Sequence, residues 1–187
     1  MTKQTLSAKK ILVILSLSLF LAVSSNSFAA GSGRPGMTDP SVVKEVDINR
    51  YAGLWNEVAH SQNFFQKGCA RSTAEYGVID ALSISVHNVC YRSDGSTRDI
   101  SGVAKVVDPQ EPAKLKVRFN FFARGDYWIT HLDPQYDWAV VSGPKKANLF
   151  ILSRRFPMDA KTLEEILATL KAEGYDLSTL VYDQPTP

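Results

Sequence analysis

Three histidines, two cysteines and scattered carboxylates are the side chains of this sequence that most often do chemistry. His60, His87 and His131 lie far apart, and none stands in an H-E-x-x-H or Cys/His spacing that would hold zinc. His131 and Asp133 are two residues apart, but no serine nucleophile accompanies them. There is also no G-x-S-x-G elbow and no glycine-rich phosphate loop. The sequence therefore predicts that the protein is not an enzyme and has no catalytic residues, metal or cofactor.

The first thirty residues have the pattern of a secretory signal peptide. Three lysines precede an apolar run at 11–23, and Ser27 and Ala29 then stand two apart, as signal peptidase requires. The run is short for a bilayer span, although an N-terminal anchor helix is the alternative. We predict that residues 1–29 are a signal peptide and that the mature protein is periplasmic or secreted.

Removal of this segment changes the net charge. Residues 1–29 carry three lysines and no acid, so 18 basic and 19 acidic side chains remain, a net charge of −1 rather than +2. Such a balance gives no attraction to nucleic acid or an anionic membrane. No cysteine precedes Cys69, so we expect no covalent lipid anchor. Residues 30–45, rich in Gly and Pro at their start, predict a flexible segment before one domain at 46–182 and a tail at 183–187.

Cys69 and Cys90 are the only cysteines in the chain. Export would place them where disulfides persist, which predicts a Cys69–Cys90 bridge. A bridge that closes a loop of about 20 residues stabilises a fold by roughly 3 kcal/mol on the chain-entropy model. Two free buried thiols are the alternative. A catalytic cysteine is not expected, because the partner cysteine would quench it.

From residue 46 onward, polar and apolar residues mostly alternate. Residues 114–119 show this best, with basic side chains on one face and apolar side chains on the other. Similar runs, separated by turn residues, lie at 53–61, 71–78, 83–87, 100–107, 126–132, 138–142 and 149–153. The sequence therefore predicts an all-β fold, an eight-stranded antiparallel up-and-down β-barrel. Such a barrel is wide enough to hold one small ligand.

One segment near the C-terminus has helical spacing instead. Apolar residues between 158 and 173 recur three and four positions apart, with Asp159 as a candidate N-cap and Gly174 as a stop. We predict one C-terminal α-helix packed on the barrel wall, followed by a short strand at 179–182.

Alternation also predicts which side chains face the barrel interior. Glu57 is two residues from Trp55 and should share its inward face, where it either forms hydrogen bonds at the barrel base or meets a ligand head group. A shift of one residue would invert a whole strand's assignment, and simple filling of the barrel is the alternative role for each residue. The predicted ligand-binding residues on the strand faces are Ala74, Tyr76, Val78, Ala104, Val106, Val117 and Phe119. Asn88, Tyr127 and Trp138 are predicted as polar tips or aromatic walls near the mouth.

Residues 47–59 resemble the first strand of a lipocalin. They carry the G-x-W signature of that family as Gly53 and Trp55. Asp133 and Tyr136 resemble the turn before strand seven, although the usual threonine is absent and the spacing is longer. The resemblance is greatest to the bacterial outer-membrane lipocalins, apolipoprotein D and the plant temperature-induced lipocalins.

Arg154 stands where lipocalins have the arginine that ends the last barrel strand, and in the family this arginine packs on the G-x-W tryptophan at the closed end. The resemblance therefore implies a structural role for Arg154. It also implies binding and transport or storage of a small hydrophobic ligand, a fatty acid or lysophospholipid. The alternatives are a protein-binding lipocalin that acts through its open-end loops, with Phe64 and Phe65 as lid or interface, and a cavity isomerase. Whether the chain forms a dimer is left open.

Overall fold

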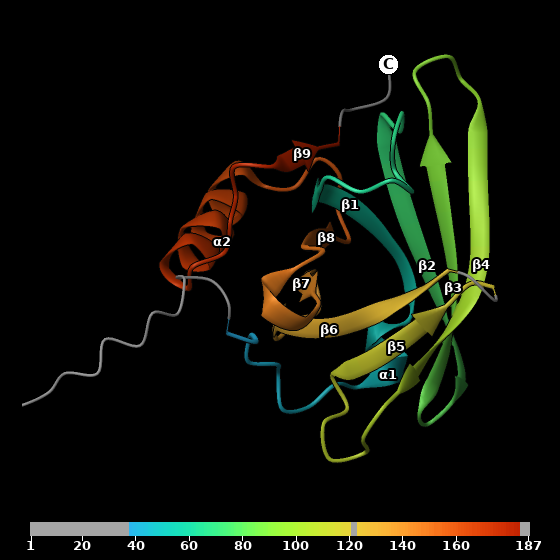
Figure 1. The fold of residues 1–187 in the computed structure, drawn as a ribbon, viewed down its shortest axis with the longest axis vertical. Coiled ribbons are helices and arrows are strands. Elements are labelled where there is room, and N and C mark those ends of the chain that lie inside the picture. Colours follow the sequence, from blue (N-terminus) through green and yellow to red (C-terminus); the bar gives the residue numbers. More distant parts are fainter. Residues whose placement is uncertain (1–37, 121–122, 184–187) are drawn as a thin grey trace, which may run out of the picture. The chain divides into compact units, whose positions relative to one another are not determined.

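Eight antiparallel strands form a closed barrel in the computed structural model, which describes residues 38–120 and 123–183 (Figure 1). Each strand pairs with the next along the chain, and β1 pairs with both β2 and β8, which closes the sheet. The predicted eight-stranded up-and-down barrel is confirmed; the predicted signal peptide lies outside the described residues. The strands are β1 (Gly53–Ser61), β2 (Arg71–Asp80), β3 (Ser83–Tyr91), β4 (Thr97–Val106), β5 (Lys114–Arg118), β6 (Arg124–Leu132), β7 (Trp138–Ser142) and β8 (Phe150–Ser153).

The predicted C-terminal helix is α2 (Ala160–Ala172), which begins after Asp159, whose carboxylate accepts a hydrogen bond from the Thr162 N–H at 2.9 Å. Its apolar face packs on the outside of β1, β7 and β8 (Figure 1). The remaining elements are α1 (Ile48–Tyr51), a short 3₁₀ turn (Pro144–Lys146) and β9 (Leu180–Tyr182). No helix of the described residues is long and apolar enough to cross a membrane.

Two apolar clusters hold the fold together. One fills the closed end of the barrel around Trp55 and Tyr51, and the other lies between the barrel wall and α2, around Ile166 and Leu170. Strands β7 and β8 contribute to both clusters, because alternate side chains point into the barrel and toward the helix. These two strands are therefore apolar on both faces.

Part of the segment predicted to be flexible is packed against the barrel. Val42 and Val43 pack on the inner cluster, and the Val43 N–H donates to the Ile129 carbonyl at 3.1 Å. The Asp39 carboxylate accepts a hydrogen bond from the Lys145 N–H at 2.8 Å. Residues 38–45 of this segment are therefore in contact with the barrel through Val42, Val43 and Asp39.

Strand β1 separates from β2 halfway along its length. It pairs with β2 only from Gly53 to Asn56, a bulge follows between Glu57 and Ala59, and β9 then pairs with the last residues of β1. A bulge inserts one extra residue, so residues three apart can share a face. Glu57 and His60 consequently lie on the same side of β1, where regular alternation would place them on opposite sides.

Candidate functional site

A cavity of about 500 Å³ occupies the barrel interior. It is lined by residues of the β1–β2 connection and by residues at the adjoining ends of β3, β4 and β6. Because successive strands are antiparallel, the β1–β2, β3–β4 and β5–β6 connections all lie at the same end of the barrel, opposite α1. We call residues 62–70 the mouth loop; Asn63 to Gln66 form part of the cavity lining.

The structure brings six of the ten predicted ligand-binding residues together around this cavity. Ala104 is fully buried and Val106 partly buried, but both pack within the closed-end cluster instead of lining the cavity. Val78 is 45% exposed, because inward alternation continues along β2 beyond the part of the barrel that other side chains fill. The six lining residues are Ala74, Tyr76, Asn88, Val117, Phe119 and Tyr127.

Trp138 lies outside the barrel. It packs on the cluster beneath α2, together with Val140, whereas Ala139 and Val141 point into the barrel. The prediction that Trp138 contributes to the cavity is therefore wrong. The reason is that β7 is apolar on both faces, so that its pattern does not distinguish the interior from the helix-covered side.

Several lining residues were not predicted from the sequence. Val86, Phe150 and Leu152 add apolar wall, and their inward alternation on β3 and β8 is the signal that could have found them. Arg98 and Arg124 lie at the rim, at the starts of β4 and β6. No local pattern distinguishes these two arginines from the other exposed cations of the strands.

Three tyrosines lie on the side of the cavity nearest the closed end, and we call them the tyrosine triad. The Tyr51 and Tyr127 hydroxyls lie 2.6 Å apart, and the Tyr127 hydroxyl donates to Tyr76 at 2.9 Å. Burial raises the pKa of all three phenols well above the usual tyrosine value. The triad therefore stays uncharged, and it gives the cavity floor a small polar group.

The mouth loop is held at its middle and at its C-terminal end. The Arg98 guanidinium donates to the Phe65 carbonyl, and the Gln66 side chain donates to the Glu57 carboxylate. The predicted disulfide between Cys69 and Cys90 is confirmed, and it ties the end of the loop to β3. Because both cysteines are bonded, neither supplies the free thiol that a cavity isomerase would need.

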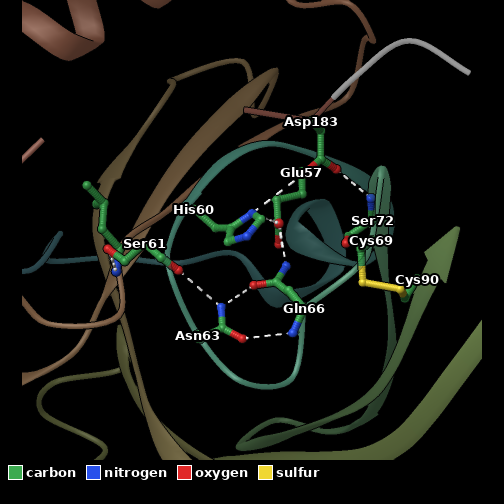
Figure 2. Close-up of polar contacts among 10 residues, drawn as sticks. Glu57, His60, Ser61, Asn63, Gln66, Cys69, Ser72, Cys90 and Asp183 are labelled. Carbon is green, nitrogen blue, oxygen red and sulfur yellow. Dashed lines mark hydrogen bonds and ion pairs between the residues drawn. A yellow bond between two sulfur atoms is a disulfide. The ribbon is translucent and has the colours of Figure 1, made fainter. Parts of the chain in front are cut away.

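Glu57 points into the barrel, as predicted, but its partners are not at the barrel base. Its carboxylate lies 2.6 Å from His60 Nδ1 and accepts a hydrogen bond from Gln66 of the mouth loop. Asp183, directly after β9, completes this group at 3.7 Å from the same nitrogen (Figure 2). Burial raises the pKa of Asp183 to about 7, and the nearby Glu57 carboxylate adds to the shift. We call these three residues the carboxylate–histidine cluster.

The signature residues lie at the closed end. The Arg154 guanidinium lies 3.7 Å from the centre of the Trp55 ring, the stacking that the resemblance implied. Gly53 has a φ of +94°, a conformation that favours glycine. The Asp133 carboxylate accepts a hydrogen bond from the Gln135 N–H at 2.9 Å, and the Tyr136 hydroxyl accepts one from Asp47 N–H at 2.9 Å. None of these five signature residues lines the cavity.

Comparison with known proteins agrees with this geometry. The profile of the lipocalin-like domain matches residues 46–185. Temperature-induced lipocalin-1 of Arabidopsis thaliana is 35% identical over 148 residues, which cover 74% of this chain and 79% of the plant protein. Outer membrane lipoprotein Blc of Vibrio cholerae serotype O1 is 33% identical over 168 residues, 89% of this chain and 97% of that protein.

The solved structure of insecticyanin from the tobacco hornworm Manduca sexta has the same fold. It superposes with a TM-score of 0.65 at 21% sequence identity, and the match covers 81% of this chain and 88% of insecticyanin. The chain belongs to the lipocalin family, as its G-x-W motif and terminal arginine indicated.

Proposed function

We propose that this lipocalin binds a single-chain anionic amphiphile, a fatty acid or a lysophospholipid, and transports or stores it. The observation that carries the proposal is the barrel cavity of about 500 Å³ with an apolar wall and a polar rim. Ligand pockets of this size usually combine apolar walls with a few polar groups that fix the orientation of the ligand. Eight-stranded barrels are wide enough for one such ligand.

The rim favours an anionic head group. Its two carboxylates each have another partner, because Asp99 lies 3.3 Å from the His87 imidazole and Asp126 lies 3.9 Å from the Lys116 ammonium group. Arg98 and Arg124 pair with no carboxylate among the described residues. Arg98 gives one N–H to the Phe65 carbonyl, and the remaining N–H groups of the two guanidinium groups can bind a carboxylate or phosphate. The polar head group would therefore lie at the mouth, with the alkyl chain directed toward the tyrosine triad.

One buried acceptor bears on the choice between the two ligand classes. Asn88 Oδ1 is buried, lies in the cavity lining and has no hydrogen-bond partner. An unpartnered buried amide oxygen is costly, and a ligand hydroxyl would satisfy it. A lysophospholipid carries such a hydroxyl on its glycerol, whereas an ionised fatty acid has no donor.

Burial of the alkyl chain is sufficient for useful affinity. A 16-carbon chain gains about 12 kcal/mol at ~0.8 kcal/mol per methylene. Association and chain ordering oppose this by roughly 4 to 8 kcal/mol, which leaves about 4 to 8 kcal/mol, a Kd between roughly 1 mM and 1 µM. Because most of this energy is non-directional, we expect broad selectivity among chain lengths.

The proposal extends to where the protein works. The basic start, apolar run and small residues of the N-terminal segment support export, with function in the periplasm or outside the cell. The disulfide supports the same compartment, because such bonds persist in oxidising surroundings.

The first experiment is solvent extraction of the purified protein followed by mass spectrometry. A stoichiometric single-chain lipid is expected. The delipidated protein is then titrated with a fluorescent fatty acid, with competition by lysophospholipids and by a fatty alcohol of equal length. Absence of both a co-purified lipid and a saturable site would refute the proposal.

Two matched pairs of variants locate the site. Val117→Trp should fill the cavity and weaken binding at least 10-fold, whereas Arg118→Trp, at the neighbouring exposed residue of the same strand, should leave it unchanged. Arg124→Gln should weaken fatty-acid binding about 5-fold without affecting the alcohol, since exposed ion pairs contribute ~1 kcal/mol. Arg118→Gln, on an exposed residue outside the cavity lining, is the control.

A second candidate function is suggested by the mouth loop. Phe64 and Phe65 are 84% and 63% exposed, and exposed aromatic pairs are typical of protein interfaces. A protein-binding lipocalin would retain its partner when Val117→Trp fills the cavity, and it would lose that partner in a Phe64→Ser, Phe65→Ser variant. A lipid carrier would instead lose its ligand when Val117→Trp fills the cavity.

A further inference from the structure

The carboxylate–histidine cluster directs three donor atoms toward one point. Glu57 Oε1 and Asp183 Oδ1 lie 2.6 and 3.7 Å from His60 Nδ1, and one donor atom from each residue lies within 4.8 Å of the others. Figure 2 shows the Glu57 and Asp183 carboxylates next to the His60 imidazole. Among residues 38–120 and 123–183, no other three His, Cys, Asp or Glu side chains form such a group.

The fold places this cluster where strand pairing changes. The bulge in β1 turns Glu57 and His60 to the same side, and β9 then carries Asp183 into the gap that opens as β1 leaves β2. The Asp183 N–H donates to the Val58 carbonyl at 3.0 Å, which fixes the backbone of this residue against β1. The three donors therefore come from two chain segments held by backbone hydrogen bonds.

Two carboxylates and one imidazole are buried together in this position. The side chains of Glu57, His60 and Asp183 are only 8%, 4% and 1% exposed. His60 Nδ1 is buried and lacks an aligned hydrogen bond, although Glu57 Oε1 lies close by. A buried nitrogen that faces two carboxylates without a well-aligned hydrogen atom between them is typical of a ligand set for a cation.

We propose that Glu57, His60 and Asp183 bind a divalent transition-metal ion of the zinc type. Zinc takes imidazole nitrogen and carboxylate oxygen at about 2.0 to 2.2 Å, so the donors of a tetrahedral site lie about 3.3 Å apart. The observed separations of 2.6 and 3.7 Å bracket that value, and small side-chain rotations would equalise them. Calcium and magnesium require more oxygen ligands and do not favour imidazole.

Both carboxylates already have the outer hydrogen bonds that orient metal ligands. The Gln66 amide donates to Glu57 Oε1, and the Ser72 N–H donates to Asp183 Oδ2, which leaves Asp183 Oδ1 directed at His60 (Figure 2). A bound ion would thus connect β1, the mouth loop and the segment after β9. Bound metal would hold the mouth loop in place and stabilise the open end of the barrel.

The experiment uses tag-free, chelator-treated full-length mature protein, with Co²⁺ as a spectroscopic probe and Zn²⁺ in calorimetry. We expect one Co²⁺ per chain, with the intense visible absorption of a four-coordinate site, and displacement of Co²⁺ by Zn²⁺. Asp183→Asn and His60→Gln should each weaken binding more than 10-fold, and Gln66→Ala should do so by about 10-fold through the outer hydrogen bond.

The matched control is His87→Gln, because His87 also has a carboxylate, Asp99 at 3.3 Å, but both side chains are exposed. This variant should bind metal like the wild type. If His60→Gln does not fold, the imidazole NMR signals of the wild-type protein identify the histidine that binds the metal, because the chain has only three histidines. Zn²⁺ should shift one signal, which His87→Gln and His131→Gln assign to His60 by exclusion.

The proposal is overturned if no metal binds below ~1 mM, if binding survives Asp183→Asn and His60→Gln, or if Zn²⁺ shifts the signal of His87 or His131 instead. Lipid titrations with Zn²⁺ and with chelator are run in parallel. Failure of the metal site would leave a saturable lipid site intact, so this test is separate from that of the proposed function.

Discussion

Arg154→Met should destabilise the barrel strongly and leave ligand affinity almost unchanged. The Arg154 guanidinium lies 3.7 Å from the centre of the Trp55 ring, at the closed end of the barrel. Its Nη1 donates to the Leu54 carbonyl at 2.8 Å, and its Nη2 donates to the Arg50 and Ala52 carbonyls at 2.8 and 2.9 Å. Methionine can cover the indole ring, but it supplies none of these hydrogen bonds.

The expected cost follows from these contacts. Cation–π stacking contributes about 0.5 to 2 kcal/mol, and a hydrogen bond from a charged donor about 1.5 to 3 kcal/mol. Because the guanidinium is only partly buried and water can replace some of its bonds, we expect a total loss of about 3 to 5 kcal/mol. For a domain of this size the Tm should fall by roughly 8 to 15 °C, and the urea midpoint by about 2 M.

Urea unfolding followed by far-ultraviolet circular dichroism measures the loss, and lipid titration of the same samples measures affinity. Arg155→Met is the matched control: Arg155 is the next residue and is exposed, so the change should stay within ~0.5 kcal/mol. A wild-type urea midpoint in Arg154→Met would refute the structural role. So would a large loss of lipid affinity at an unchanged midpoint, since Arg154 does not line the cavity.

Three further changes test other parts of the fold. Replacing Cys69 and Cys90 by serine should cost about 3 kcal/mol, as the bridge closes a loop of 21 residues; equal urea midpoints would contradict this. Asp159→Ala should cost ~1 kcal/mol by removing the N-cap of α2, and Asp159→Asn, which retains an acceptor, should restore most of it. The tyrosine triad should make the free energy of unfolding fall as the pH rises above ~10, because its phenols ionise more readily in the unfolded chain than in the native protein. Ultraviolet difference spectra at high pH should show about three fewer ionised tyrosines in the native protein than in the unfolded chain. Ionisation of all tyrosines in the native protein would refute this prediction.

Local sequence was a good guide where a strand has one apolar and one polar face. The alternation at 114–118 assigned Val117 to the interior and Lys116 to solvent, and the structure has both in these places. The two ends of α2 were predicted for the same reason, because Asp159 and Gly174 act through neighbouring backbone groups. Such signals are local, so no knowledge of the rest of the fold is needed.

Alternation was insufficient where both faces of a strand are buried. Trp138 belongs to a strand whose inner face packs in the barrel and whose outer face packs under α2, and the sequence does not say which face is which. Val78 has the correct inward phase but lies beyond the packed part of the barrel. Alternation therefore predicts which face of a strand a side chain lies on, but it does not predict how far along the barrel axis that side chain lies.

The sequence by itself determined the barrel, its C-terminal helix, the disulfide pair and the family. These depend on short-range periodicity, on turn residues and on the few motifs that resemble those of lipocalins. The carboxylate–histidine cluster was decided only by the tertiary structure. His60 looked isolated along the chain, since regular alternation separates residues three apart and Asp183 is more than a hundred residues away. A single bulge and the pairing of β9 with β1 bring them together, and both depend on long-range strand contacts that no local pattern encodes.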